Sequence, residues 1–282
     1  MTARHRRAFF FLAVVLAFAA LAPAARRNIV LTLDKKEIRG LTSSGLVLVF
    51  QIEVANASSN AYALSEYDYR VVVEGTDLFA WRTALDQPIT VEKEGRTKIA
   101  LPFKISYAEV FKTVPAAEGK TKLGCYTTGL MIFTDAKKRQ EKVPFAFSGE
   151  FPVFRDVEVA VQPVEVKDLT VGGTEFVFSF GLRNPNDFEI VLNGLAYDLG
   201  FDGRTAVKGV IEGESRLAPG GEKAFSLPVM LDFFEVGREM HAVLDKPSAA
   251  CRLGLESGAD SVWGPIKLST TKDAEVRLKR AD

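Results

Sequence analysis

The sequence predicts an all-β protein built from two tandem antiparallel β-sandwiches, each with one short helix. Three observations support this class. Apolar and polar residues alternate along many short segments, and most of the 21 Phe among 282 residues lie within those segments. Turn signals separate the segments at intervals of roughly 8 to 12 residues, as in sandwiches. The two halves of the chain also repeat each other in order.

The first half alternates strand patterns with turns. In Gly45–Val54, one set of alternate residues is wholly apolar and therefore predicted to face the core: Leu48, Phe50, Ile52 and Val54. The cluster Asn56–Asn60 then predicts a turn, because Asn and Ser side chains bond to nearby backbone. The other strands expected in this half are Asn28–Ile38, Tyr62–Val73, Leu78–Asp86, Thr97–Ile105, Leu123–Phe133 and Val143–Phe147.

One short helix interrupts these strands. Ser106 and Glu109 have the spacing of a capping box, and apolar residues follow at helical spacing until Pro115. The second half has a counterpart in Phe233–Leu244, which also follows a Leu-Pro pair.

The halves superpose with two offsets that differ by two residues. An offset of 128 pairs Phe50 with Phe178, Asn56 with Asn184, Leu64 with Leu192, Tyr69 with Tyr197 and Gly75 with Gly203. An offset of 126 pairs Gly95 with Gly221, Leu101-Pro102 with Leu227-Pro228 and Cys125 with Cys251. A duplication followed by one loop deletion explains both offsets.

We therefore expect two β domains, at residues 26–150 and 156–279. The boundary is placed in Gly149–Asp156, where the alternating pattern changes, and this segment is too short to act as a free tether. In the second domain, Val157–Val166 and Phe176–Leu182 are expected as strands. A β-barrel is the alternative architecture.

Residues 1–24 have the features of a secretory signal peptide. Three arginines precede the apolar run Ala8–Leu21, and Ala22-Pro23-Ala24 offers a small-x-small cleavage pattern. Cleavage is predicted after Ala24, which would export the protein to the periplasm or the extracellular space and leave no mature transmembrane segment. The alternative is an uncleaved N-terminal signal anchor, since Ala8–Ala25 is just long enough to span a bilayer.

Charge and residue usage argue against several classes of function. The 36 basic and 36 acidic side chains balance, so nothing indicates a nucleic-acid partner. His241 is the single histidine beyond the predicted signal peptide, and the sequence shows no recognisable arrangement for a histidine-based zinc site or a Ser-His-Asp triad. We therefore expect a protein that is not an enzyme, with no catalytic, metal-binding or cofactor-binding residues and no cofactor.

The segment FVFSFGLRNPN, followed by GLAYDLGFDG and LAPGGEKAFSLPV, resembles the late embryogenesis abundant type 2 (LEA type 2) family. Its unit is also called the WHy domain, for water stress and hypersensitive response. The resemblance spans residues 29–150 and 157–279. Its most specific part is Arg183-Asn184-Pro185-Asn186, which the first half departs from with Ala57 and Ser58. It implies a sandwich of the fibronectin type III kind and a non-enzymatic protein linked to desiccation and other stress.

The family turn has a structural interpretation. Asn184 can bond to the backbone two residues on, and Pro185 fixes φ at the first corner of the turn. We therefore expect Asn184, Pro185, Asn186 and the equivalent Asn56 to set the register of core strands.

The two cysteines are predicted to be free, buried thiols. Cys125 and Cys251 occupy equivalent positions in successive domains, which would place them too far apart for a disulfide. A bridge is the alternative, because exported proteins commonly contain disulfides.

The favoured function is a structural or protective role in desiccation or osmotic stress. The alternative is a binding module that holds an apolar ligand, a lipid or a partner protein at the domain interface or at sheet edges. No ligand or partner can be named from the sequence.

Overall fold

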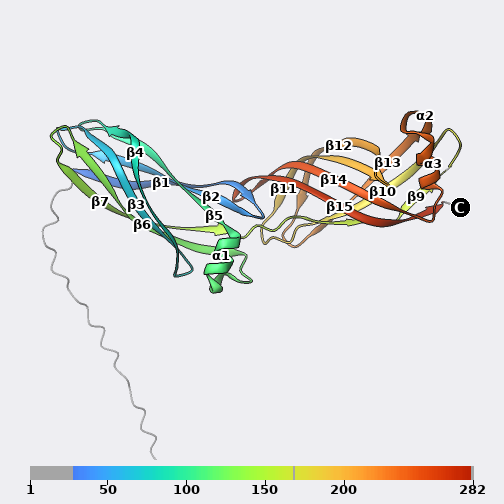
Figure 1. Ribbon diagram of the computed structural model, residues 1–282, viewed down its shortest axis with the longest axis horizontal. Coiled ribbons are helices and arrows are strands. Elements are labelled where there is room, and N and C mark those ends of the chain that lie inside the picture. The colour runs from blue at the N-terminus through green and yellow to red at the C-terminus, as the bar shows by residue number, and fades with distance from the viewer. Residues whose placement is uncertain (1–27, 168, 281–282) are drawn as a thin grey trace, which may run out of the picture.

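The computed structural model describes residues 28–167 and 169–280, so the predicted signal peptide lies outside the described residues. The predicted all-β class is confirmed: two β-sandwiches lie end to end (Figure 1). We call residues 28–152 the first unit, residues 153–157 the linker and residues 158–280 the second unit. No helix in the described part of the chain is long and apolar enough to cross a bilayer.

The first unit packs a three-stranded sheet, β1-β2-β5, against a four-stranded sheet, β4-β3-β6-β7, and all pairs within each sheet are antiparallel. The strands are β1 (Ile29–Thr42), β2 (Gly45–Asn56), β3 (Tyr62–Val73), β4 (Thr76–Val91), β5 (Arg96–Ser106), β6 (Lys122–Asp135) and β7 (Gln140–Pro152).

The second unit repeats this arrangement, but its strands differ in two ways. The end of its last strand pairs in parallel with Val164–Val166. The segment expected as a single strand at 157–166 is divided by Gln162-Pro163 into β8 and β9, which both pair with β10. Proline cannot donate to a strand ladder, which accounts for the break. The strands are β8 (Glu158–Val161), β9 (Val164–Lys167), β10 (Gly173–Arg183), β11 (Ile190–Phe201), β12 (Arg204–Leu217), β13 (Glu222–Asp232), β14 (Ser248–Ser261) and β15 (Gly264–Arg280).

The helices lie at one end of each sandwich, α1 near the junction and α2 and α3 at the far end (Figure 1). α1 (Tyr107–Thr113) is followed by the 3₁₀ turn η1 (Pro115–Ala117). The capping-box prediction is wrong in its hydrogen bonds, because the Ser106 side chain makes no cap bond. The second helical segment is interrupted at Gly237, with φ of 95°, and forms α2 (Phe233–Val236) and α3 (Arg238–Leu244).

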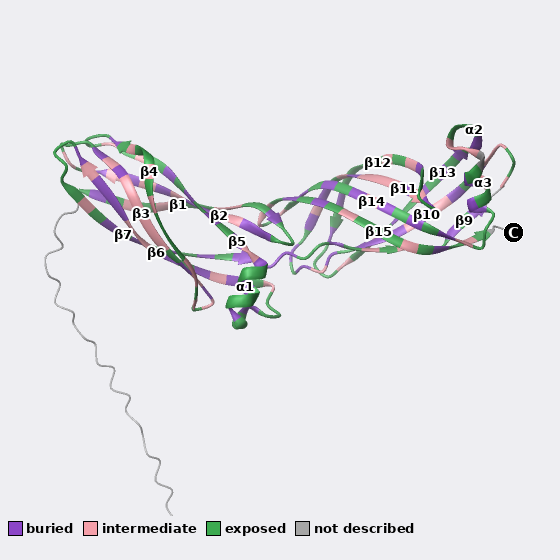
Figure 2. Cartoon of the chain, viewed as in Figure 1, coloured by how far each residue is buried: buried purple, intermediate pink, exposed green. Residues whose placement is uncertain are grey.

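Burial alternates along the strands, as Figure 2 shows, and places the apolar set of each strand between the sheets. Phe50, Phe178 and Phe180 are all fully buried. The apolar cluster of the first unit is continuous with that of the second through Phe154 of the linker. The hydrophobic core therefore connects the two sandwiches.

A buried asparagine braces the same turn in both units. The Asn184 side chain, 0% exposed, donates to the carbonyls of Phe188, Leu217 and Ala218 at 2.8, 3.1 and 3.2 Å. Its Oδ1 atom accepts from the Asn186 backbone N–H at 3.0 Å. Every polar atom of this buried side chain is thereby satisfied, which burial requires.

The Asn56 amide repeats these bonds in the first unit. It donates to the carbonyls of Asn60, Val91 and Glu92 and accepts from the Ser58 backbone N–H. These partners stand 128 or 126 positions before those of Asn184, the two offsets found in the sequence.

The braced turns also hold the chain where it enters each unit. In the first unit, the Ala57 N–H donates to the Asn28 carbonyl at 2.7 Å. Pro185 has no N–H to do the same in the second unit. There, the Asn186 amide bonds to both the N–H and the carbonyl of Arg155, at 2.8 Å each.

The other end of the linker is fixed to the first unit. The Tyr107 hydroxyl donates to the Pro152 carbonyl at 2.6 Å and accepts from the Phe154 N–H at 3.2 Å. Thr121 donates to Asp187 across the junction at 2.7 Å. Hydrogen bonds to both units therefore restrain the linker.

A second connection lies apart from the linker. The end of β1 pairs in parallel with the start of β15 at Leu41 and Ile266, and both side chains are buried. This pairing joins sheets of the two units into one eleven-stranded sheet.

Replacing Asn184 by Ala is expected to lower the free energy of unfolding by about 3 kcal/mol, because three buried carbonyls lose their donor. Chemical denaturation followed by circular dichroism measures the change. The matched control is Asn193→Ala, which removes an exposed amide bonded to Asp260 and should change stability by less than about 0.5 kcal/mol. Equal stability of the two variants would contradict the brace.

Candidate functional site

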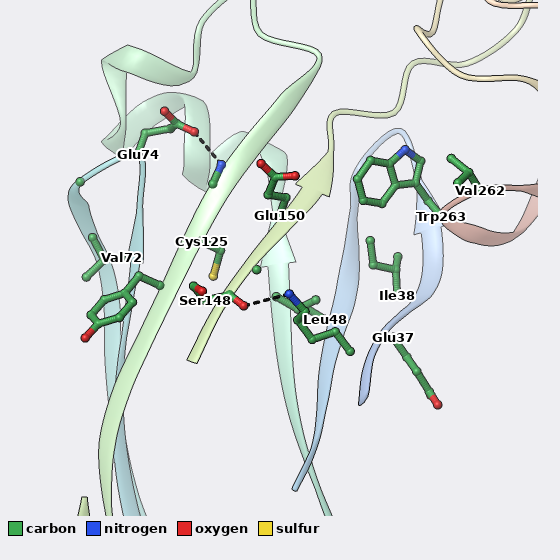
Figure 3. A pocket seen from close by; sticks show the side chains of 15 residues that line it. Glu37, Ile38, Leu48, Val72, Glu74, Cys125, Ser148, Glu150, Val262 and Trp263 are labelled. Carbon is green, nitrogen blue, oxygen red and sulfur yellow. Dashed lines mark hydrogen bonds between the residues drawn. The ribbon is translucent and has the colours of Figure 1, made fainter. Parts of the chain in front are cut away.

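An open groove lies along one edge of the first sandwich, between β1 of one sheet and β7 of the other (Figure 3). Its volume is ≈ 940 Å³. The Lys36 ammonium crosses the groove and donates to the Ser148 carbonyl at 3.1 Å. A side chain, rather than strand pairing, therefore bridges the two edges at this point.

The groove has an apolar floor and is completed by the second unit. The buried side chains of Leu48 and Cys125 lie among its lining residues. Val262 and Trp263, from the β14–β15 turn of the second unit, line the groove beside Ile38 of β1 (Figure 3). The second unit thus contributes one part of the groove wall.

Carboxylates stand on the rim, and each has a basic partner. Glu37 accepts from Arg39 at 2.6 Å and from Lys35 at 3.1 Å, and these hydrogen bonds lower its pKa. Glu150 pairs with Lys122 at 2.9 Å.

Glu74 bonds to Lys120 and to the Gly124 N–H, and these two bonds, the first being the larger cause, lower its pKa. Carboxylates with lowered pKa values remain ionised at neutral pH and are poor proton donors. Because these carboxylates are paired, the apolar floor is the part of the groove that is suited to holding a ligand.

Both predicted thiols are free and buried in the structure. Burial raises the pKa of Cys125 to about 11. Burial, and to a lesser extent the nearby charge of Asp273, raises the pKa of Cys251 to about 12. Thiols are nucleophilic as thiolates, so both side chains are inert at neutral pH.

The predicted turn residues and the groove lie in different places. Asn184, Pro185 and Asn186 form the junction turn, and Asn56 forms its counterpart at the opposite end of the first unit. Of the residues predicted from sequence, only Cys125 lines the groove.

Sequence reasoning missed Lys36 and Trp263, which lie on segments brought together by the tandem arrangement. Trp263 follows Val262, which is 82% exposed, at a hairpin tip. Two large apolar residues at a turn are unusual, and this pattern in the sequence could have indicated a contact there.

His241 packs its ring against Phe233 at 5.4 Å between centroids, in an edge-to-face arrangement. The described residues contain no group of three or more His, Cys, Asp or Glu side chains placed to hold a metal ion.

Comparison with known proteins bears on the second unit. The family model described as "Late embryogenesis abundant protein" matches residues 179–277, from β10 through most of β15. The second unit matches the LEA type 2 family. The LEA type 2 match includes Asn184, Pro185 and Asn186. It does not extend to the first unit, where the resemblance was also expected.

Other comparisons are more distant. No curated protein matches the chain. A solved structure of a protein from Archaeoglobus fulgidus is 16% identical, with a TM-score of 0.35, over 43% of this chain and 97% of that one. Red sea bream transglutaminase is 13% identical, with a TM-score of 0.27, over 90% of this chain and 32% of its own.

The raised thiol pKa values predict lower stability at alkaline pH. A thiol whose pKa is higher in the folded state stabilises the fold fully below its unfolded pKa, near 9, and loses that contribution as pH rises. The free energy of unfolding is therefore expected to fall as pH rises from about 9 to about 11. Guanidinium denaturation of wild type and of the Cys125→Ala/Cys251→Ala variant measures this fall, which should be smaller in the variant. An identical fall in both proteins would contradict the prediction.

Proposed function

We propose that this chain is a non-enzymatic, exported LEA type 2-like protein of two tandem WHy-type units, with a structural or protective role in desiccation or osmotic stress. The match of the LEA type 2 model to residues 179–277 is the observation that carries the proposal. The asparagine brace supports extending it to the first unit, because Asn56 repeats the hydrogen bonds of Asn184. The signal-peptide pattern of residues 1–24 supports export.

The interior is compatible with a role at low water activity. Among the described residues, every buried side-chain nitrogen or oxygen has a hydrogen-bond partner within the protein. A buried polar group without a partner costs free energy, and water commonly fills that role. Interior groups bonded to protein atoms keep their partners when water is withdrawn.

A second candidate function is a binding module for an apolar ligand, a lipid or a partner protein. The groove favours it, because Leu48 and Cys125 provide an apolar floor and Trp263 of the second unit completes the wall. Apolar concave sites with a few polar groups are typical of ligand binding.

Gene deletion followed by drying and by osmotic upshift tests the protective role. The deletion strain is expected to survive less well, and expression of the wild-type chain should restore survival. A Gly149→Leu variant is a second complementation arm, because the added side chain enters the groove from β7. If this variant also restores survival, protection does not depend on binding in the groove.

Normal survival of the deletion strain would contradict the protective role. Native mass spectrometry of the purified protein then tests the second candidate. A molecule that co-purifies with the wild type and is absent from Gly149→Leu would support groove binding.

A further inference from the structure

The two units differ at the sheet edge that borders the groove. In the second unit a strand covers this edge, and in the first unit the edge is open. In the second unit, the end of β15 pairs in parallel with β9: Leu278 with Val164, Lys279 with Glu165 and Arg280 with Val166. The 128-residue offset places Val164–Val166 on Lys36–Ile38 of β1, which line the groove. The equivalent edge of the first unit therefore lacks the closing strand.

The linker explains this difference. The registers pair Cys125 with Gly149 and Cys251 with Ala274, so Leu278–Arg280 correspond to Val153–Arg155, just after the end of β7. Val153 bonds to the Thr121 carbonyl as Leu278 bonds to the Pro247 carbonyl. The next two residues differ, because Tyr107 binds the Phe154 N–H and Asn186 binds Arg155. Hydrogen bonds at the junction therefore hold the residues that would otherwise pair with this edge of β1.

Most of the outer edge of β1 is not paired with another strand of the described chain. On the side away from β2, its pairing within the described chain is at Leu41 with Ile266. Backbone N–H and C=O groups on a free strand edge are a template for another strand. The Lys36 ammonium bonds to the Ser148 carbonyl, and this flexible side chain can swing into solvent.

We propose that an extended segment of a partner protein adds in parallel to β1 at Lys36–Ile38, closing the first sandwich as Leu278–Arg280 closes the second. This proposal rests on the binding role given above as the second candidate function. Strand addition of this kind takes affinity from main-chain hydrogen bonds and specificity from alternate side chains.

The structure indicates the chemistry of that segment. The groove is narrow at Gly149, because a Cβ there would already touch Lys36 at 3.5 Å and Phe50 at 3.6 Å. The apolar lining that an apolar side chain of the partner strand can meet lies at Ile38 and Trp263. The added strand would end where the β14–β15 turn reaches β1, since a Cβ on Gly264 would lie 3.2 Å from the Ile38 carbonyl oxygen.

The closing strand of the second unit indicates which residues suit this edge. The carboxylates of the groove are already paired, Glu37 with Lys35 and Arg39, Glu74 with Lys120 and Glu150 with Lys122. The template is therefore the sequence of the closing strand itself, Leu278-Lys279-Arg280. We infer an apolar residue followed by basic residues.

A peptide that copies the second unit's own closing strand is the probe. The acetylated and amidated peptide has the sequence of residues 274–280, AEVRLKR. It is titrated into the mature full chain carrying Trp81→Phe, which leaves Trp263 at the groove as the single tryptophan. A saturable change in Trp263 emission is expected, with slower hydrogen exchange of the amides of Lys36–Ile38.

Variants at strand glycines test the location. Gly149→Leu fills the groove and should weaken binding at least about tenfold, whereas Gly149→Ala, a smaller addition, should weaken it less. Gly258→Leu is the matched control, since Gly258 lies on an exposed strand position of the second unit with open space around it, and it should bind as wild type. Circular dichroism establishes that each variant is folded.

Four results would overturn the proposal. The first is binding that is unchanged in Gly149→Leu. The second is binding that survives N-methylation of the Leu-Lys-Arg amides, which removes main-chain donors. The third is absence of peptide binding while decanoate shifts Trp263 emission; in that case strand addition fails and the apolar-ligand form of the binding role stands. A peptide-independent dimer formed through the groove would assign the edge to a second copy and also overturn the proposal.

Discussion

The structure depends on one interaction, the hydrogen bonding of a buried asparagine amide at the turn where the chain enters each sandwich. Asn184 joins three carbonyls from two segments of the second unit, and Asn56 does the same in the first. Buried amides of this kind are costly to leave unsatisfied and so favour a single register. The asparagine therefore specifies where the strands on either side begin and where the incoming chain is held.

Joining two such units end to end produces the groove. The chain leaves the first sandwich after Pro152, so the residues equivalent to the closing strand continue into the linker, where Tyr107 binds Phe154 and Asn186 binds Arg155. The second unit closes its own edge with Leu278–Arg280 and also places Trp263 beside the open edge of the first. The two copies have the same fold, and they differ in strand pairing at this edge and at the interface between them.

The sequence predicted what depends on local pattern. Alternation in Gly45–Val54 and the two repeat offsets were enough for the strands and the tandem fold, because strand faces follow a period of two. The Asn184 bond to the Asn186 backbone was also predictable, since it is local. The bonds from Asn186 to Arg155 and from Lys36 to Ser148 were not, because their geometry arises from the path of the linker and the packing of β1 against β7. Neither contact leaves a pattern in the sequence.

The central claim is that the junction makes the two sandwiches one cooperative unit. Guanidinium unfolding of two single-tryptophan proteins tests it, because Trp81 lies in the first unit and Trp263 in the second. Trp263→Phe and Trp81→Phe should show coincident transitions, and adding Tyr107→Phe and Asn186→Ala to both should separate them. Separate transitions with the junction intact would contradict the account.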